Sequence, residues 1–204
     1  MWNQELLQKT ISERMSDYQL IIASNRQPYR HEIQSEKIVC YREPGGLVTA
    51  MDPVMRALKG LWIASGTSEY DFHVVDQHSK VMVPEKDSGY CLKRIGLSKE
   101  EKHGYYYGFS NEGLWPLCHV AYTRPFFKET DWQYYQQVNK RFAEAILKEA
   151  GNRPAFVWIQ DFHLALVPKY LKESGNSNII SSIFWHIPWP NPEVFKICPQ
   201  KKRF

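Results

Sequence analysis

The 204-residue sequence predicts an α/β protein built on one Rossmann-like, mostly parallel sheet with helices on both faces. Two observations predict this fold. Four short apolar runs are spread along the chain, and their unbroken apolar character is typical of strands covered on both faces. Between them, apolar residues recur three and four positions apart, as in amphipathic helices. Strands that alternate with helices favour a parallel sheet.

The four predicted strands follow from the apolar runs. They cover residues 20–23, 61–64, 156–159 and 179–185. Residues 69–102 are polar around one short apolar run at 81–83, so we expect a hairpin or a long excursion from the sheet there.

The clearest predicted helix covers residues 131–150, where apolar side chains recur at helical spacing. Thr130 and Gln133 are placed for a capping box, and Gly151 supplies a stop. Shorter helices are expected over residues 47–58 and 164–173.

Length and composition indicate one soluble domain, because 204 residues with 43% hydrophobic side chains suffice for a single buried core. Residues 1–16 are expected to form an amino-terminal helix outside the sheet. The net charge of +4 comes from 26 basic and 22 acidic residues that are intermixed, which argues against a nucleic-acid surface.

Four widely spaced cysteines and the absence of a secretory apolar segment favour a reduced, cytoplasmic protein. No apolar run approaches the ~20 residues needed to span a bilayer, so we expect no membrane association.

Polar side chains follow each predicted strand. They are Ser24-Asn25-Arg26, Ser65-Gly66-Thr67, Gln160-Asp161-Phe162-His163 and His186-Ile187-Pro188. Ligands bind beyond the carboxyl ends of strands in such sheets. The sequence therefore predicts one crevice on which an arginine, an aspartate and two histidines converge.

Each of these residues also has a simpler interpretation. Arg26 suits a phosphate, which its guanidinium can grip with two hydrogen bonds, or an ordinary surface ion pair. Pro44-Gly45-Gly46 suits an anion held by backbone amides at a helix start, or only a turn. The GxGxxG and GKS/T patterns are absent, so a dinucleotide or P-loop site is not supported.

Asp161 and His163 lack a third metal ligand at helical spacing, so we expect no metal site. His186 suits either a catalytic role or a hydrogen-bonded core histidine. A covalent serine or cysteine nucleophile is not expected, because the sequence has neither a GxSxG motif nor a Cys-His pattern.

Six segments between Tyr18 and Pro199 resemble, in order, the amino-terminal domain of trehalose-6-phosphate synthases. They are Ser24-Asn25-Arg26, Gly45-Gly46-Leu47, Gly60-Leu61-Trp62, YYGFSNEGLWP at 106–116, WIQDFH at 158–163 and HIPWPNPE at 186–193. The runs at 106–116 and 186–193 carry most of the specificity.

The resemblance implies a retaining glycosyltransferase of GT-B architecture that transfers glucose from UDP-glucose to glucose-6-phosphate. The expected partners are these two substrates, and no metal or cofactor is implied. In such enzymes the departing phosphate takes the proton from the acceptor hydroxyl. That agrees with the absence of a paired-carboxylate signature of the hydrolase kind.

Carried over residue by residue, the resemblance implies that Arg26, Tyr106 and Trp115 hold the acceptor, with Arg26 and Tyr106 facing its phosphate. Gly46 would lie against the donor diphosphate. His186 and Asp161 would contact the transferred glucose, as donor-binding and catalytic residues.

Two departures from the family pattern stand out. Gln160 occupies a position where many relatives carry histidine. The family would also continue past Pro199 into a second, UDP-binding domain, whereas this sequence ends at Phe204. We therefore expect an amino-terminal extension over residues 1–17 and an acceptor-side domain over 18–204. The carboxy-terminal domain is expected to be missing or supplied by a full-length synthase.

Three functional hypotheses remain open at this point. The chain belongs to a trehalose-6-phosphate synthase, or to a glucosylglycerol-phosphate synthase with the same donor, and in either case is expected to be inactive alone. It is a non-catalytic sugar-phosphate-binding module. Or it is a truncated product without function.

Overall fold

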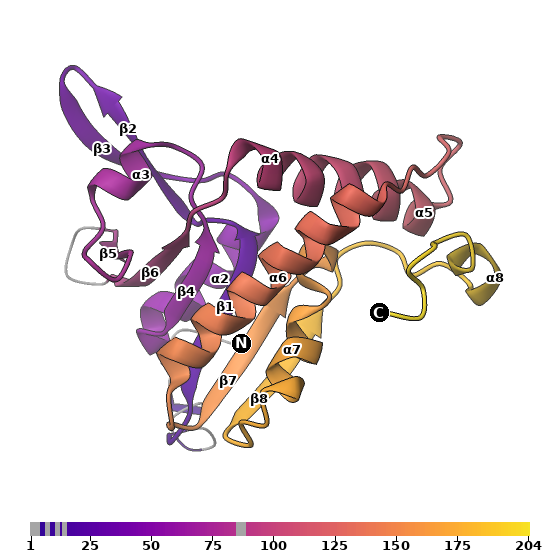
Figure 1. Cartoon of the computed structure of the whole chain (residues 1–204). Coiled ribbons are helices and arrows are strands. Elements are labelled where there is room, and N and C mark those ends of the chain that lie inside the picture. Colours follow the sequence, from indigo (N-terminus) through magenta and orange to yellow (C-terminus); the bar gives the residue numbers. More distant parts are fainter. Residues whose placement is uncertain (1–4, 7–8, 11–12, 14–15, 85–88) are drawn as a thin grey trace.

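The structure is a computed structural model that describes residues 5–6, 9–10, 13, 16–84 and 89–204. Its centre is a six-stranded sheet in the order β5-β6-β4-β1-β7-β8 (Figure 1). Neighbouring strands are parallel except for the antiparallel pair β5 and β6. The strands are β1 (Gln19–Arg26), β4 (Leu61–Ser65), β5 (Lys80–Val83), β6 (Tyr90–Ile95), β7 (Ala155–Gln160) and β8 (Ile179–Phe184).

The predicted fold class and all four predicted strands are confirmed. The prediction for residues 69–102 is confirmed in one respect and wrong in another. β5 and β6 do form a hairpin, but the hairpin is part of the sheet, because β6 pairs in parallel with β4. β6 was not predicted as part of the sheet because polar residues flank it, although its Tyr90 and Leu92 are fully buried in the core.

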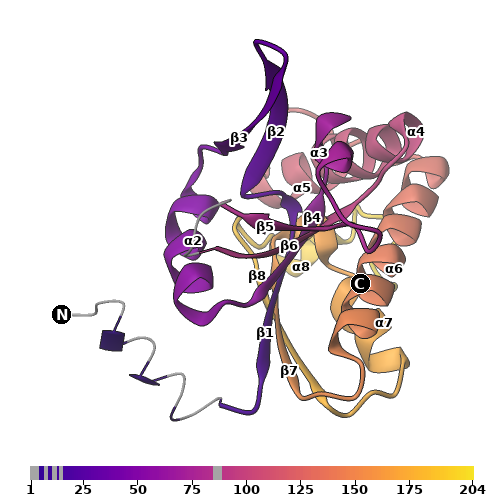
Figure 2. The same cartoon turned by 90° about the vertical axis from the view of Figure 1, so that its left-hand side faces the viewer.

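Helices cover both faces of the sheet, as predicted (Figures 1 and 2). α6 (Glu129–Ala150) and α7 (Val167–Glu173) lie on one face, and α2 (Gly46–Leu58) lies on the other. The alternation along β1 explains the two layers, because successive strand side chains point to opposite faces. Ile21 packs in the cluster that contains α6, whereas Ile22 packs with α2.

Two details of the predicted helices need correction. The capping box at Thr130 and Gln133 does not form: α6 begins at Glu129, after an extended Lys128 whose side chain makes no capping hydrogen bond. At its other end Gly151 terminates α6 as predicted, with φ of 55°.

The helix predicted over 164–173 is divided. Phe162–Leu164 forms a 3₁₀ turn (η2), and α7 begins only at Val167. Pro168 explains the later start, because proline fits the first turn of a helix but not its interior.

A hairpin of β2 (Tyr29–Gln34) and β3 (Lys37–Arg42) was not predicted. Figure 2 shows it projecting beyond the main sheet. Its two-residue turn uses Ser35 and Glu36, both at positive φ (48° and 63°). Asn-Gly is the usual pair in such turns, so the sequence carried no turn signal here.

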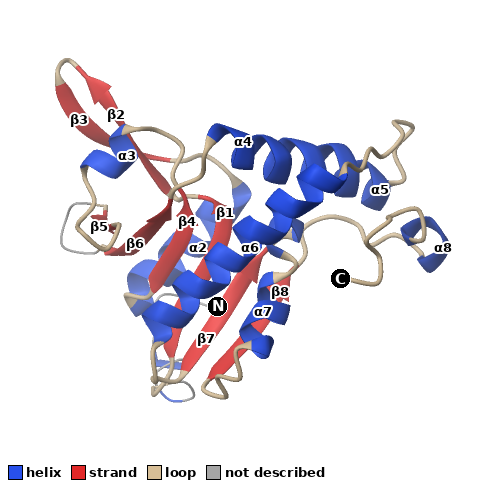
Figure 3. Cartoon of the chain, viewed as in Figure 1, coloured by secondary structure: helices blue, strands red, loops and turns tan. Residues whose placement is uncertain are grey.

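The segment between β6 and α6 is helical and unusually wide. α4 (Lys99–Lys102) leads into η1, a π-helix over His103–Leu114, and then into α5 (Trp115–His119) (Figure 3). Two further short helices are α3 (Tyr70–His73) and α8 (Pro192–Phe195).

Three glycines let η1 approach α6 closely. A Cβ added to Gly104, Gly108 or Gly113 would lie within 2.4, 2.3 or 2.7 Å of α6 or the segment before it. The glycines are four and five residues apart and nevertheless share one face, because i→i+5 bonding widens each turn.

The predicted helix over residues 1–16 lies mostly outside the described residues. At the other end of the chain, the ring of Phe204 stacks on Phe109 at 6.1 Å between centroids. The described carboxy-terminal segment therefore folds back onto the core around η1 and α6.

Candidate active site

The carboxyl ends of β1, β4, β7 and β8 meet at one edge of the sheet. Ser24 of β1 lies opposite Gln160 of β7, and Gln160 lies opposite Phe184 of β8. The residues that follow these positions are therefore brought together, as the sequence predicted.

A β-bulge in β1 sets the direction of the Arg26 side chain. Between Ser24 and Arg26 the register with β4 shifts, so that Arg26 rather than Asn25 lies opposite Ser65. The Oγ of Ser65 donates to the carbonyl oxygen of Asn25 at 2.8 Å and holds the bulge in place. Bulges commonly re-aim a side chain next to a functional site.

The guanidinium of Arg26 is available to a ligand. Arg26 is exposed and makes no ion pair within the described part of the chain, so the ordinary surface ion pair is not what holds it. Its charge instead acts on a histidine in the cavity described next.

A cavity of about 490 Å³ opens at these strand ends, and we call it the site cavity. Small-molecule sites typically have volumes of ~300–1,000 Å³. The residues that line the site cavity are Arg26, Tyr106, Asn111, Trp115, Asp161, Phe162, His163 and Ile187.

The wide helix explains how three of these residues reach the same cavity. Tyr106, Asn111 and Trp115 are five and four positions apart. In an α-helix, residues five apart would point about 140° away from each other. The i→i+5 bonding of η1 brings Tyr106 and Asn111 onto one face, opposite the glycine face that packs on α6.

Trp115 presents its indole at the mouth of the cavity, with 44% of the residue exposed. The imidazole of His119, one turn later on α5, stacks behind it at 4.1 Å between centroids. Nδ1 of His119 also lies 2.8 Å from the carbonyl oxygen of Trp115. The indole is therefore a supported flat surface, which suits the apolar face of a sugar ring.

Asp161 adopts a strained backbone conformation, with φ of 74° and ψ of 166°. This region is normally restricted to glycine and costs about 1–3 kcal/mol for other residues. One carboxylate oxygen, Oδ1, accepts hydrogen bonds from the amides of Phe162 (2.9 Å) and His186 (3.2 Å). Burial raises the pKa of Asp161, while these amides act in the opposite direction.

His163 is a neutral histidine in the cavity wall. Burial, followed by the charge of Arg26, lowers its pKa to about 3. Its ring stacks on Tyr106 at 5.4 Å, and its Nδ1 lies 3.6 Å from Oδ2 of Asp161. At neutral pH this imidazole offers one N–H donor and one acceptor rather than a charge.

His186 lies beside the site cavity and does not line it. Its Nε2 lies 2.9 Å from Oε1 of Gln160; with the amide in this orientation the oxygen accepts and Nε2 carries the proton. While the ring is neutral, Nδ1 is left as an acceptor for a sugar hydroxyl. His186 is exposed, so it is not a core histidine.

Gly46, like His186, is a predicted site residue that does not line the site cavity. It is the first residue of α2, and a Cβ added to it would meet nothing within 4 Å. The backbone conformation favours glycine at the neighbouring position instead, because Gly45 has φ of 144°. Nothing in the fold itself requires glycine at position 46.

Sequence reasoning gave no role to two polar residues of the cavity wall, Asn111 and His163. Asn111 lay inside the YYGFSNEGLWP run, and His163 was expected at the crevice. Asn111 was missed because nothing in the sequence indicated that η1 is a π-helix, and α-helical spacing does not place Asn111 beside Tyr106.

Within residues 5–6, 9–10, 13, 16–84 and 89–204, no group of three or more His, Cys, Asp or Glu side chains is arranged to hold a metal ion. The described helices also include none with the length and apolarity to cross a membrane.

The site combines a cation, two aromatic surfaces, a carboxylate with one oxygen left for a ligand, and neutral imidazole and amide groups. Such a set can bind a phosphorylated sugar: Arg26 and the Tyr106 hydroxyl suit the phosphate, and Asp161 suits ring hydroxyls.

The sequence and the fold of the chain are similar to those of known proteins. The profile of glycosyltransferase family 20 matches residues 18–204. The chain is 36% identical over 190 residues to a trehalose-6-phosphate synthase of Mycobacterium ulcerans (strain Agy99), covering 92% of this chain and 36% of that protein.

Two solved structures are also similar. One is an α,α-trehalose-phosphate synthase of Burkholderia xenovorans in complex with glucose-6-phosphate. It has a TM-score of 0.67 and 25% identity, over 91% of this chain and 37% of that one. The other, from E. coli and bound with UDP-2-fluoro glucose, has a TM-score of 0.69 and 26% identity, over 91% of this chain and 36% of that one.

The chain therefore belongs to glycosyltransferase family 20. It spans about 36% of the length of the curated relatives that it matches.

Proposed function

We propose that this member of glycosyltransferase family 20 binds glucose-6-phosphate in the site cavity. There it contributes the acceptor side of a synthase that transfers glucose from UDP-glucose with retention and forms trehalose 6-phosphate. One observation carries the proposal: Arg26, Tyr106, Trp115 and Asp161, drawn from three distant parts of the sequence, line a single cavity.

The proposed acceptor contacts follow from the chemistry of the cavity wall. Arg26 forms charged hydrogen bonds with the phosphate, and the hydroxyl of Tyr106 donates another. Trp115 covers one face of the sugar ring. His163, which is neutral, accepts or donates a single hydrogen bond without adding a charge next to Arg26.

On the donor side, we propose that Asp161 and His186 orient the hydroxyls of the transferred glucose and act as catalytic residues. Gly46 is assigned to the donor diphosphate. The support for Gly46 is the open space at its Cα, which a phosphate could approach at the start of α2.

In the proposed reaction the acceptor hydroxyl forms the new bond to the anomeric carbon of glucose, and the bond from that carbon to UDP breaks. The hydroxyl proton passes to the departing phosphate. The proposal needs no metal, no cofactor and no protein base.

We further propose that the rest of the donor site comes from a carboxy-terminal domain or from a full-length synthase. The support is that the relatives are almost three times as long as the part this chain matches. A cytoplasmic location is proposed as well, supported by four cysteines that are free thiols.

Release of UDP by the purified 204-residue chain, given UDP-glucose and glucose-6-phosphate, tests the proposal together with calorimetric binding of each sugar. We expect glucose-6-phosphate to bind and UDP release to require the donor-side partner. A folded sample that does not bind glucose-6-phosphate would overturn the proposal. UDP release by this chain alone would extend it to complete transfer.

Arg26→Ala is the matched test of the acceptor pocket. It should weaken glucose-6-phosphate binding by about 1.5–3 kcal/mol, the usual value of a charged hydrogen bond. His186→Ala is the control and should leave that binding unchanged, because its proposed partner is the donor sugar. The reverse pattern would show that the pocket has been assigned wrongly.

A further inference from the structure

A second cavity, of about 530 Å³, adjoins the site cavity, and we call it the α4 cavity. It lies between the carboxyl ends of β1 and β4, the turn before α2, and the helical segment that begins with α4. Arg26 and Tyr106 line both cavities. The roles proposed above make no use of the remaining walls of the α4 cavity.

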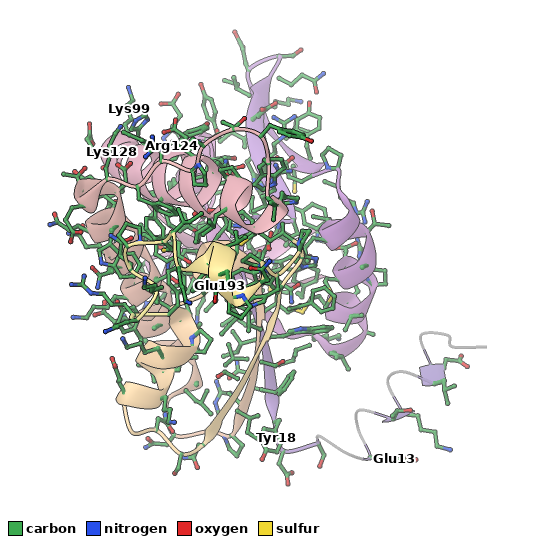
Figure 4. The ribbon with its side chains drawn as sticks, turned by 90° about the vertical axis from the view of Figure 1, so that its right-hand side faces the viewer. Glu13, Tyr18, Lys99, Arg124, Lys128 and Glu193 are labelled. Carbon is green, nitrogen blue, oxygen red and sulfur yellow. The ribbon has the colours of Figure 1, made fainter. Side chains whose placement is uncertain are left out.

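The charges around this cavity are unbalanced. Its lining includes three cationic side chains, Arg26, Lys99 and Lys102, and one acidic side chain, Glu43. Glu43 is already engaged, since its Oε1 lies 3.0 Å from Nε of Arg30. Among the described residues, none forms an ion pair with Lys99 or Lys102. Figure 4 shows Lys99 at the surface of the molecule.

The floor of the α4 cavity is rigid. Gln27 and Thr67 contribute to its lining, and both are tied to the buried carboxylate of Asp71. The Nε2 of Gln27 donates to Oδ2 of Asp71 at 2.6 Å, and the amide of Thr67 donates to the same atom at 2.8 Å. Because Asp71 is fully buried, these groups are held in place before any ligand arrives.

The remaining walls match a small phosphorylated molecule. Arginine grips a phosphate with two hydrogen bonds, and lysines add positive charge. Tyr107 adds a hydroxyl, while Val48 and Leu97 provide apolar surface for the uncharged part of a ligand. Three cations against a single lining acid, which is itself paired with Arg30, create a positive potential that attracts an anion.

We propose that the α4 cavity is a second anion site, which binds the phosphate or diphosphate group of a small molecule between Arg26, Lys99 and Lys102. The site is distinct from the acceptor pocket, and the inference does not depend on the proposed transfer reaction. Its cations come from two separate parts of the chain, the end of β1 and α4.

Titration of the 204-residue chain with pyrophosphate at fixed ionic strength tests this inference. Lys99→Gln combined with Lys102→Gln should weaken pyrophosphate binding by ~10-fold or more, as expected when charged contacts are lost. The same double variant should leave the affinity for glucose-6-phosphate within about twofold, because neither lysine lines the site cavity.

Two further variants separate the cavities. Trp115→Ala should weaken the binding of glucose-6-phosphate and leave that of pyrophosphate unchanged, whereas Arg26→Gln should weaken the binding of both ligands. Lys148→Gln combined with Lys172→Gln is the matched control, because these exposed lysines line neither cavity. Melting temperatures of all variants show whether each remains folded.

Three results would overturn the proposal. In the first, pyrophosphate fails to bind the folded wild-type chain. In the second, the Lys99/Lys102 and Lys148/Lys172 double variants weaken pyrophosphate binding equally, which would indicate general electrostatic attraction. In the third, loss of Lys99 and Lys102 weakens the binding of glucose-6-phosphate as strongly as that of pyrophosphate. The α4 cavity would then be the phosphate end of the acceptor pocket. Failure of glucose-6-phosphate to bind, with pyrophosphate binding intact and sensitive to Lys99 and Lys102, would instead refute the proposed function and support the second anion site.

Discussion

Two aspartates near the same edge of the sheet, Asp71 and Asp161, use their carboxylates in opposite ways. Asp71 lies in α3, after β4, and is completely buried. Asp161 directly follows β7 and lines the site cavity. The carboxylate of Asp71 is used entirely within the fold, whereas that of Asp161 keeps one oxygen that a ligand could reach.

Asp71 has both carboxylate oxygens fully engaged. Oδ2 accepts from Gln27 and from the amides of Thr67 and Ser68, while Oδ1 accepts from the amide of His31 and lies 3.1 Å from Nη2 of Arg94. Burial alone would raise the pKa of Asp71, but the hydrogen bonds outweigh it and hold the pKa well below its usual range.

Among the described residues, Asp71 is the only acid that forms an ion pair with Arg94. It is also buried, and its remaining donors are used by Gln27, by the carbonyl oxygens of Tyr29 and Asp71, and by Nδ1 of His31. This network joins β2, α3 and β6, so it holds the projecting hairpin to the sheet.

Asp161 is the reverse case. Within the described residues only Oδ1 accepts hydrogen bonds, burial outweighs these bonds so that the pKa is raised, and the backbone is strained. A group that keeps an unused oxygen at an energetic cost is typical of a binding site. Hydrogen-bond saturation and burial thus separate the structural carboxylate of Asp71 from that of the candidate site residue Asp161.

The largest expected effect comes from Asp71→Asn. Removing the charge leaves Arg94 buried without compensation, so we expect a loss of about 3–5 kcal/mol in the free energy of unfolding. Asp161→Asn is the matched variant and should change that free energy by less than ~1 kcal/mol, because little of the fold depends on its charge. Urea denaturation of both variants measures the difference, and equal losses would erase the distinction.

The next effect concerns pH and His163. Its pKa is about 3 in the folded protein and 6.5 when unperturbed, so between these values the unfolded chain binds a proton that the folded chain does not. Stability is therefore full above pH 6.5 and falls toward pH 3, by up to about 1.4 kcal/mol per pH unit.

His163→Asn should flatten the stability profile between pH 6.5 and 5, measured by denaturation at each pH. His78→Asn, which changes an exposed histidine, serves as the control and should keep the wild-type slope. An unchanged profile in the His163 variant would mean that this ring is protonated in the folded protein.

A third effect would quantify the strain at Asp161. Asp161→Gly should be more stable than Asp161→Ala by about 1 kcal/mol, because glycine adopts positive φ without a steric penalty. Both variants should lose the contacts of the carboxylate to the ligand. If alanine proves as stable as glycine, the strain does not exist in solution.

The smallest effects extend the comparison to two adjacent glycines. Gly45 is required by its φ of 144°, so Gly45→Ala should destabilise the protein by about 1 kcal/mol. Gly46 begins α2 in open space, so Gly46→Ala should leave stability unchanged or raise it by a few tenths of a kcal/mol. Thermal melts of the two variants test this order, and equal losses would show that Gly46 also serves the fold.

Much of the fold was predictable because local patterns specify it. The apolar runs that became β1, β4, β7 and β8 have a length and composition that suit buried strands. The β2–β3 hairpin and the place of β6 in the sheet were missed because their signals are not local. Ser35-Glu36 is an unusual turn pair, and β6 is recognisable as a strand only through its pairing with β4.

The candidate site was predictable to a similar extent. A parallel sheet places its strand ends at one edge, so Arg26 and Asp161 could be expected to meet from the order of strands alone. The position of Asn111 could not, since it depends on the width of η1. That width accompanies the close contact of three glycines with α6 and the segment before it.

The sequence by itself determined the α/β architecture, the edge of the sheet that carries the chemistry, and most of the residues gathered there. Only the tertiary structure decided which aspartate is saturated and which is left for a ligand. It also decided that Arg26 has no ion-pair partner among the described residues, and that a second, cationic cavity adjoins the first. The reason is physical: strand and helix periodicity are encoded locally, whereas hydrogen-bond saturation and charge balance depend on partners that the fold brings from distant parts of the chain.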